Sequence, residues 1–113
     1  MRDYKAAGKI LTRMETCKIV ILPREKNDDT KYEIGWMNED QVNFVRSLEL
    51  KDFVEGPSRN YDRKRLDPVW IFKKKITYDR STSNLSNSTV ELYVKFSINK
   101  NNKVIVISLH FDE

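Results

Sequence analysis

The chain has 113 residues, of which 39% are hydrophobic and 34% are charged, and its formal net charge is +4. This length predicts one domain, residues 1–113, and no apolar run is long enough to span a bilayer, so we expect no membrane partner. The moderate excess of positive charge favours an acidic partner such as nucleic acid.

The composition also limits the chemistry of the protein. One cysteine, Cys17, excludes an internal disulfide, and one histidine, His110, leaves too few ligands for a Cys/His zinc site. The sequence has no Gly-rich phosphate loop, no GxSxG or HExxH motif and no carboxylate cluster that would hold two magnesium ions. We therefore expect neither a metal nor a cofactor. The N-terminus lacks a hydrophobic signal segment, which predicts a cytoplasmic protein.

The N-terminal part of the chain is predicted to form a helix, a short extended run and a loop. Residues 2–17 carry apolar side chains at helical spacing, at Tyr4, Ala7, Leu11 and Met14. Residues 18–22 form a short β-branched run that Pro23 ends. Residues 24–31 are charged and rich in turn-forming residues, so we interpret them as a loop.

A second helix is predicted over residues 39–48. Asn38 and Gln41 have the spacing of a capping box, in which side chains satisfy the free backbone N–H groups at a helix start. Residues 50–54, which Gly56-Pro57 closes, are interpreted as a short turn of helix or an ordered connection.

A basic segment occupies residues 59–67. It combines four cations with Asn, Asp and Tyr residues, and the cations are Arg59, Arg63, Lys64 and Arg65. A solvated connection and a phosphate-binding rim beside a sheet are both consistent with this pattern.

Residues 69–76 are predicted to form a strand. Its core face carries Trp70, Phe72 and Ile76, and its other face carries Ile71, Lys73 and Lys75. Residues 77–89 are polar and low in complexity, which predicts a mobile loop between two antiparallel strands.

The C-terminal residues 90–113 are predicted to form a hairpin. In the first half, apolar residues at Leu92, Val94, Phe96 and Ile98 alternate with polar ones. In the second half, Ile105, Ile107, Leu109 and Phe111 alternate with Val104, Val106, Ser108 and His110. Between the halves, Asn101-Asn102 suits a two-residue turn with positive φ. If Lys100 pairs with Lys103 around this turn, Phe96 faces Ile107 and Val94 faces Leu109.

The same register collects reactive side chains on the polar face of the hairpin. It places Tyr93 opposite His110 and Lys95 opposite Ser108. An imidazole exchanges protons near neutral pH, a lysine holds a phosphate and a phenol donates to a phosphoryl oxygen. These groups suffice for RNA cleavage without a metal, in which the ribose 2′-hydroxyl attacks the neighbouring phosphate.

Several segments of the chain resemble the MqsR family of toxin-antitoxin ribonucleases. They are LPREKN at residues 22–27, NEDQVNFVRSLELKDF at 38–53, VWIF at 69–72, LYVKFSI at 92–98 and VIVISLHFDE at 104–113. The resemblance implies a fold similar to RelE-type toxins, with helices packed on an antiparallel sheet. It also implies cleavage of messenger RNA without a metal, and inhibition by a cognate antitoxin protein.

The functional residues of that family match this chain unevenly. The tyrosine of its penultimate strand falls on Tyr93, and the lysine two residues later falls on Lys95. A lysine near the end of its final strand falls on His110, which can act as base or acid. Its other lysine and its glutamine fall on Glu55 and Ile71, so those two roles are not carried over. The candidates to supply the missing charge are Arg63, Lys73 and Lys75.

The sequence therefore predicts an α+β domain with two main helices on one face of a three-stranded antiparallel sheet, acting as a small endoribonuclease toxin. The expected catalytic residues are His110, Tyr93 and Lys95. The expected RNA-binding residues are Arg63, Lys64, Arg65, Lys73, Lys75 and Ser108. The alternatives are a nucleic-acid-binding module without catalysis and a protein-binding module of a phage or mobile element.

Overall fold

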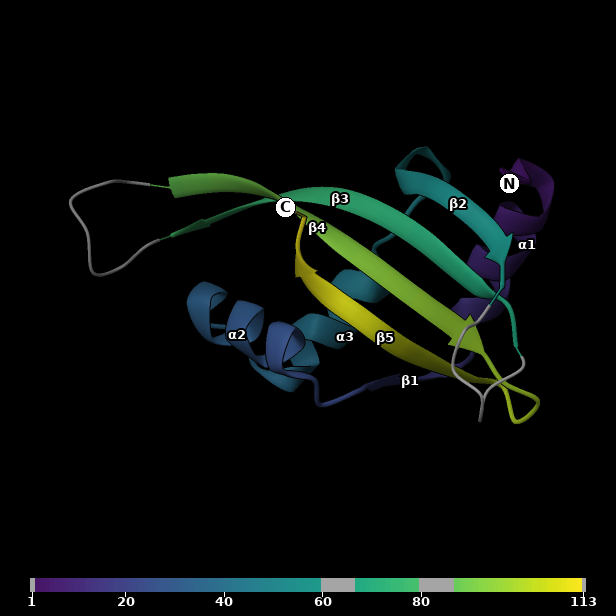
Figure 1. The fold of residues 1–113 in the computed structure, drawn as a ribbon, viewed down its shortest axis with the longest axis horizontal. Helices are drawn as coiled ribbons and strands as arrows, with labels where there is room; N and C mark the ends of the chain where they lie inside the picture. The colour runs from purple at the N-terminus through teal and green to yellow at the C-terminus, as the bar shows by residue number, and fades with distance from the viewer. Residues whose placement is uncertain (1, 60–66, 80–86, 113) are drawn as a thin grey trace.

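Five strands form one mixed sheet in the computed structural model, which describes residues 2–59, 67–79 and 87–112 (Figure 1). The strand order is β1-β5-β4-β3-β2, and β1 pairs with β5 in parallel whereas the other neighbours are antiparallel. The strands are β1 (Lys18–Ile21), β2 (Phe53–Ser58), β3 (Val69–Asp79), β4 (Asn87–Ile98) and β5 (Lys103–Phe111).

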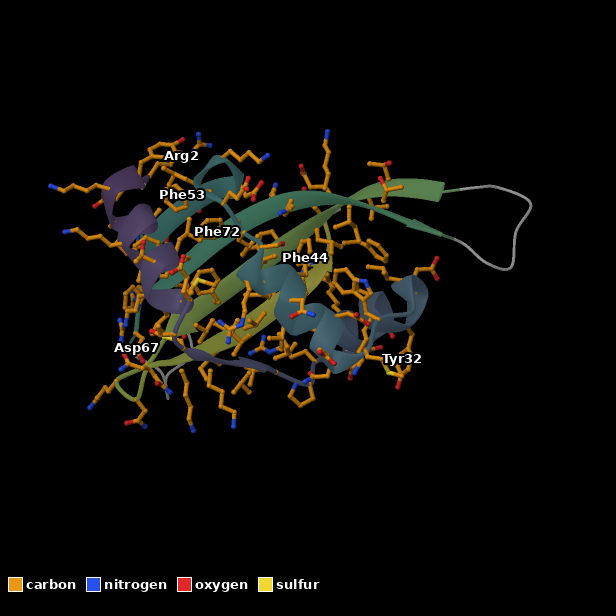
Figure 2. The ribbon with its side chains drawn as sticks, turned by 180° about the vertical axis from the view of Figure 1, so that it is seen from behind. Arg2, Tyr32, Phe44, Phe53, Asp67 and Phe72 are labelled. Atoms are coloured by element: carbon orange, nitrogen blue, oxygen red, sulfur yellow. The ribbon has the colours of Figure 1, made fainter. Side chains whose placement is uncertain are left out.

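The described residues also form three α-helices, which are α1 (Tyr4–Met14), α2 (Glu25–Ile34) and α3 (Asn38–Arg46). Helices α1 and α3 lie over one face of the sheet, and the core fills the layer between them and the strands (Figure 2). Phe72 stacks on Phe96 at 5.6 Å between ring centroids and contacts Phe53 at 5.4 Å. None of the helices in this part of the chain is long and apolar enough to cross a membrane.

The expected three-stranded antiparallel sheet is wrong in both strand number and pairing. Residues 18–21 join the sheet beside β5, far away in sequence, and an isolated β-branched run gives no sign of that partner. Residues 53–58 pair with β3 through an irregular register. Gly56 and Pro57, which we interpreted as a terminator, lie within β2. A proline is tolerated there because β2 is an edge strand and needs backbone hydrogen bonds on one side only.

Helix α2 corrects the interpretation of residues 24–31 as a loop. This helix has little apolar periodicity because the side chains that it buries are Asn27 and Thr30. Asn27 Nδ2 donates to the carbonyls of Leu22 and Ile107, and Asn27 Oδ1 accepts from the Leu109 N–H at 2.8 Å. The Thr30 hydroxyl accepts from the backbone N–H of β5 at its last residue. Helix α2 thus lies beside β5 where β1 ends, and its side chains take the place of a further strand there.

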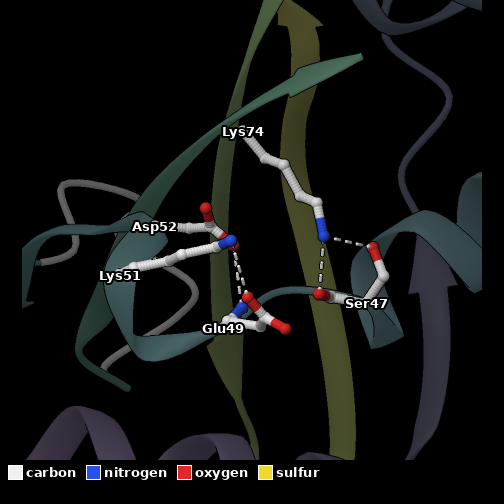
Figure 3. Close-up of polar contacts among 5 residues, drawn as sticks. All are labelled: Ser47, Glu49, Lys51, Asp52 and Lys74. Atoms are coloured by element: carbon white, nitrogen blue, oxygen red, sulfur yellow. Dashed lines mark hydrogen bonds and ion pairs between the residues drawn. The ribbon is translucent and has the colours of Figure 1, made fainter. Parts of the chain in front are cut away.

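Helix α3 confirms the second predicted helix, but it starts one residue early and ends at Arg46 rather than near residue 48. The predicted capping pair of Asn38 and Gln41 is wrong. Met37 is the N-cap, and the Asp40 carboxylate accepts from its N–H at 2.8 Å. At the other end, Lys74 Nζ donates to the Ser47 carbonyl at 2.8 Å, which places a cation at a helix C-terminus (Figure 3). In the connection that follows, the Glu49 N–H donates to Asp52.

The turn of the β4–β5 hairpin is one residue longer than expected. Asn99 N–H donates to the Lys103 carbonyl at 3.0 Å, and Asn102 has a φ of 57°. This geometry fits a three-residue turn whose last residue is left-handed. Val104 therefore pairs with Ile98, and it faces the core in place of Ile105.

A bulge in β5 then cancels this one-residue shift in the register between β4 and β5. The ladder pairs Phe96 with Val106 but Lys95 with Ser108, so Ile107 is the extra residue. The expected pairing of Phe96 with Ile107 is wrong. Beyond the bulge the pairing follows the predicted register, and Tyr93 lies opposite His110 as expected.

The hairpin of β3 and β4 is also longer than the sequence indicated. Residues 77–79 and 87–89, which we assigned to a mobile loop, pair with each other as strands, and this end of the hairpin projects beyond the other strands (Figure 1). The remaining loop residues, 80–86, lie outside the described part of the chain.

Replacing Gly56 with alanine is expected to destabilise the protein by about 2–3 kcal/mol. Gly56 has a φ of +146°, and a Cβ atom there would lie 2.8 Å from Cε3 of Trp70. The matched control is Gly8→Ala on helix α1, where a Cβ atom meets nothing within 4 Å. That change should stabilise the protein by about 0.5–1 kcal/mol. Urea unfolding of both variants checks the prediction, and equal shifts would contradict it.

Candidate functional site

Figure 1 views the sheet from the face opposite α1 and α3, which we call the open face. The predicted catalytic residues of β4 lie on this face because they alternate with side chains of the buried core. Tyr93 and Lys95 alternate with Leu92 and Val94, which are fully buried under the helices. Tyr93 and His110 stack across β4 and β5, with ring centroids 5.3 Å apart and planes inclined by 15°. The predicted cross-strand contact between phenol and imidazole is confirmed.

The imidazole is held in one orientation by its own strand. His110 Nδ1 lies 2.9 Å from the carbonyl oxygen of Phe111. A carbonyl only accepts hydrogen bonds, so Nδ1 carries a proton and donates it. In the neutral ring the lone pair is then on Nε2, which is the nitrogen able to take a proton from a substrate.

Two lysines flank the stacked rings. Lys73 pairs with Tyr93 across β3 and β4, and its Nζ lies 3.0 Å from the carboxylate of Asp112. Lys95 pairs with Ser108 one step along the ladder, as predicted. Among the residues that the structure describes, no hydrogen bond or ion pair engages the Lys95 ammonium. Lys95 is therefore available to an anion, whereas Lys73 is already neutralised.

The surroundings of Tyr93 favour its protonated form. Burial raises the pKa of the Tyr93 phenol above its ordinary value of 10.0, and the Glu55 carboxylate raises it further. Lys73 opposes the increase, and Asp112 adds to it. Tyr93 thus remains a hydrogen-bond donor throughout the neutral range.

At alkaline pH, the Tyr93→Phe protein is expected to lose less stability with rising pH than the parent protein does. The folded state keeps the Tyr93 proton to a higher pH than the unfolded state does, so above about pH 10 a rising pH favours unfolding. The stability that the protonated Tyr93 contributes is fully present below the pKa of this residue in the unfolded state. It is lost as the pH rises through the pKa in the folded state. Denaturant unfolding of both proteins at several pH values checks this, and parallel curves above pH 10 would contradict it.

The remaining predicted RNA-binding residues are placed only in part. Lys75 lies on the same face, where it pairs with Glu91 one step beyond Lys73. Arg63, Lys64 and Arg65 lie outside the described residues, so the structure does not place the proposed basic rim. Glu55 and Ile71 pair with each other across β2 and β3, and Ile71 also pairs with Lys95. These are the two positions where the chain lacks the lysine and the glutamine of the MqsR family, and both therefore border the open face.

A small hollow beside His110 was missed by the sequence interpretation. Its volume is about 100 Å³, and it is lined by Lys26, Asp29, Thr30, His110 and Phe111. Three of these residues belong to α2, which we took for a loop. Gly35 is the one sequence feature that indicates this helix, since a glycine after a charged segment is a typical helix end. It closes α2 with a φ of 82°.

A larger hollow of about 250 Å³ lies on the opposite side of the sheet, between α1 and α3. Its polar side chains include Arg46, whose guanidinium donates to the carbonyls of Met14 and Cys17. The guanidinium therefore satisfies carbonyl groups at and just after the end of α1. These contacts indicate a structural role for Arg46.

The comparisons with known proteins give no assignment: no protein-family model, curated protein or solved structure matches the chain. The resemblance to the MqsR family stays a prediction. Within residues 2–59, 67–79 and 87–112, no group of three or more His, Cys, Asp or Glu side chains is placed to hold a metal ion.

Proposed function

We propose that the protein is a metal-independent endoribonuclease that cleaves messenger RNA in the cytoplasm as the toxin of a toxin-antitoxin system. The observation that carries the proposal is the stacked pair of Tyr93 and His110 beside Lys95, with His110 Nδ1 bonded to a carbonyl and Nε2 left to the substrate. The resemblance to the MqsR family supports the toxin role and predicts a cognate antitoxin protein as the inhibitor.

In the proposed reaction, His110 Nε2 takes the proton of a ribose 2′-hydroxyl. The 2′ oxygen attacks the adjacent phosphorus and forms a bond to it, the bond to the 5′ oxygen breaks, and a 2′,3′-cyclic phosphate results. The departing 5′ oxygen takes up one proton and leaves as a hydroxyl group. This proton balances the one that His110 removed from the 2′-hydroxyl. Negative charge accumulates on the phosphoryl oxygens during the attack, and the Lys95 ammonium and the Tyr93 hydroxyl stabilise it.

Incubation of the purified protein with RNA, with and without EDTA, tests the proposal. Cleavage should occur in both samples and leave 2′,3′-cyclic phosphate ends. A His110→Ala protein purified in parallel controls for contaminating nucleases. Cleavage that EDTA abolishes would contradict the metal-independent mechanism. Binding of RNA without cleavage in either sample would favour the binding-module alternative instead.

Replacing Asp112 with asparagine is expected to increase RNA affinity and its dependence on salt. The substitution releases Lys73 from its ion pair, so a second lysine beside Lys95 becomes available to phosphate. Each additional phosphate contact should steepen the slope of log K against log salt by about 0.7 for a single strand. The matched control is Glu39→Gln, which removes the same charge from the exposed start of α3. If both variants change affinity equally, or if salt has no effect, the phosphate contacts lie elsewhere.

A further inference from the structure

Two lysines lie side by side at the end of β5 that is farthest from His110. Lys18 of β1 pairs directly with Lys103 of β5, and we call these two residues the lysine pair. Both alternate with side chains of the buried core, so both lie on the open face, where β1 meets the β4–β5 turn (Figure 1). Neighbouring strands are about 4.8 Å apart, and like charges placed directly opposite each other destabilise a sheet. This arrangement therefore concentrates positive charge at a cost in stability.

The surroundings of the lysine pair do not neutralise its charge. Within the described part of the chain, no hydrogen bond or ion pair engages the ammonium of Lys18 or of Lys103. Arg13 adds a third cation at the turn, where its guanidinium donates to Asn102 Oδ1 at 2.7 Å, a neutral acceptor. Asp67 lies at the same end of the molecule (Figure 2), but no ion pair among the described residues joins it to these cations.

The open face offers an anionic strand one favourable direction away from His110. Toward the lysine pair, the described residues of β1 and β5 place no carboxylate on this face. In the opposite direction, Asp112 neutralises Lys73, and Glu91 is the cross-strand partner of Lys75. Among the described residues, a polyanion that leaves the proposed site therefore meets uncompensated positive charge on the side of the lysine pair.

We propose that the lysine pair binds phosphates of the RNA several nucleotides away from the cleaved bond, an inference that rests on the proposed ribonuclease function. Lys103 and His110 are seven residues apart in β5, and each strand residue advances about 3.3 Å. With one residue taken up by the bulge, the two sites are roughly 20 Å apart. A stacked nucleic-acid strand has one phosphate per about 3.4 Å, so about six nucleotides span this distance, and fewer where the strand is extended.

Binding of RNA that cannot be cleaved tests this inference separately from catalysis. The probes are 2′-O-methyl oligouridylates of three and nine nucleotides, and fluorescence anisotropy at several salt concentrations measures their affinities for the whole protein. In the variant that combines Lys18→Met with Lys103→Met, the nonamer should bind about tenfold more weakly at 0.1 M salt, with a salt slope smaller by about 1.4. The trimer should bind as it does to the parent, because it is too short to reach the lysine pair from His110.

Two further variants make the test specific. Lys95→Met removes the cation beside His110, so it should weaken the binding of both probes. The control combines Lys5→Met with Lys51→Met, which removes two exposed lysines from the start of α1 and from the segment before β2, at the opposite edge of the sheet from β1. This control should keep the parental difference in affinity between nonamer and trimer.

The outcomes distinguish this inference from the ribonuclease proposal. Equal weakening of both probes in the lysine-pair variant, or an unchanged affinity for the nonamer, would overturn the inference. Thermal unfolding checks the fold: this variant should be at least as stable as the parent, because it lacks the like-charge contact. If the nonamer binds through the lysine pair but unmodified nonamer is not cleaved, the phosphate-binding surface stands and the ribonuclease proposal fails.

Discussion

RNA cleavage is expected to fall by about 10²- to 10⁴-fold when His110 is replaced by alanine, the range typical of losing a positioned acid or base. His110 is the only imidazole in the chain, and its Nε2 is the nitrogen left to the substrate. Growth arrest caused by expression of the protein should be relieved in the same variant. Single-turnover cleavage of labelled RNA measures the chemical step, and anisotropy measures binding separately.

A matched variant distinguishes chemistry from folding in this experiment. Tyr93→Phe keeps an aromatic ring against His110 but lacks the hydroxyl, so it should bind RNA normally and lose less activity than His110→Ala. The thermal unfolding of both variants should resemble that of the parent. An His110→Ala protein that folds normally and cleaves RNA at the parental rate would rule out the assignment of His110 as a catalytic residue.

Replacing Asn27 with alanine is expected to lower the free energy of unfolding by about 3–5 kcal/mol, a large part of the stability of a small domain. The Asn27 side chain is 1% exposed and makes three hydrogen bonds, to the carbonyls of Leu22 and Ile107 and from the N–H of Leu109. Its removal would leave these backbone groups without their partner, at a cost of about 1–3 kcal/mol for each buried group.

The matched control for this change is Asn43→Ala, at an exposed position of helix α3. That variant should change stability by less than about 0.5 kcal/mol, as is usual for surface substitutions. Chemical denaturation of the two variants checks the contrast. Similar stabilities would mean that β5 does not depend on the Asn27 amide.

The hairpin shows how a sequence pattern predicts one part of a ladder and fails in another. Alternation identified the faces of β4 correctly, since Leu92, Val94 and Phe96 are all fully buried. In β5 it failed before the bulge, because the longer turn moves the strand by one residue and exchanges its two faces. The bulge at Ile107 restores the original faces. The contact between Tyr93 and His110 was therefore predicted correctly although the intervening pairs were not.

The errors elsewhere have a common physical cause, which is the dependence of an element on a distant partner. Strand β1 forms because β5 offers it a parallel edge, and α2 is anchored because β5 offers backbone groups to Asn27 and Thr30. Neither partner is close in sequence, so local pattern and turn signals do not reveal it. The hollow beside His110 depends on α2 and could not have been found without that helix.

The anchoring of α2 also determines how the sheet edge meets other chains. An exposed strand edge is a template on which further strands can add, and proteins commonly protect it with charge, bulges or a covering element. Strand β5 carries β1 along its first residues, and beyond Val106 its N–H and carbonyl groups bond to side chains of a helix. An incoming strand could extend the sheet at β1, but it could not continue along β5. The helix thus restricts edge-to-edge association on this side to the four residues of β1.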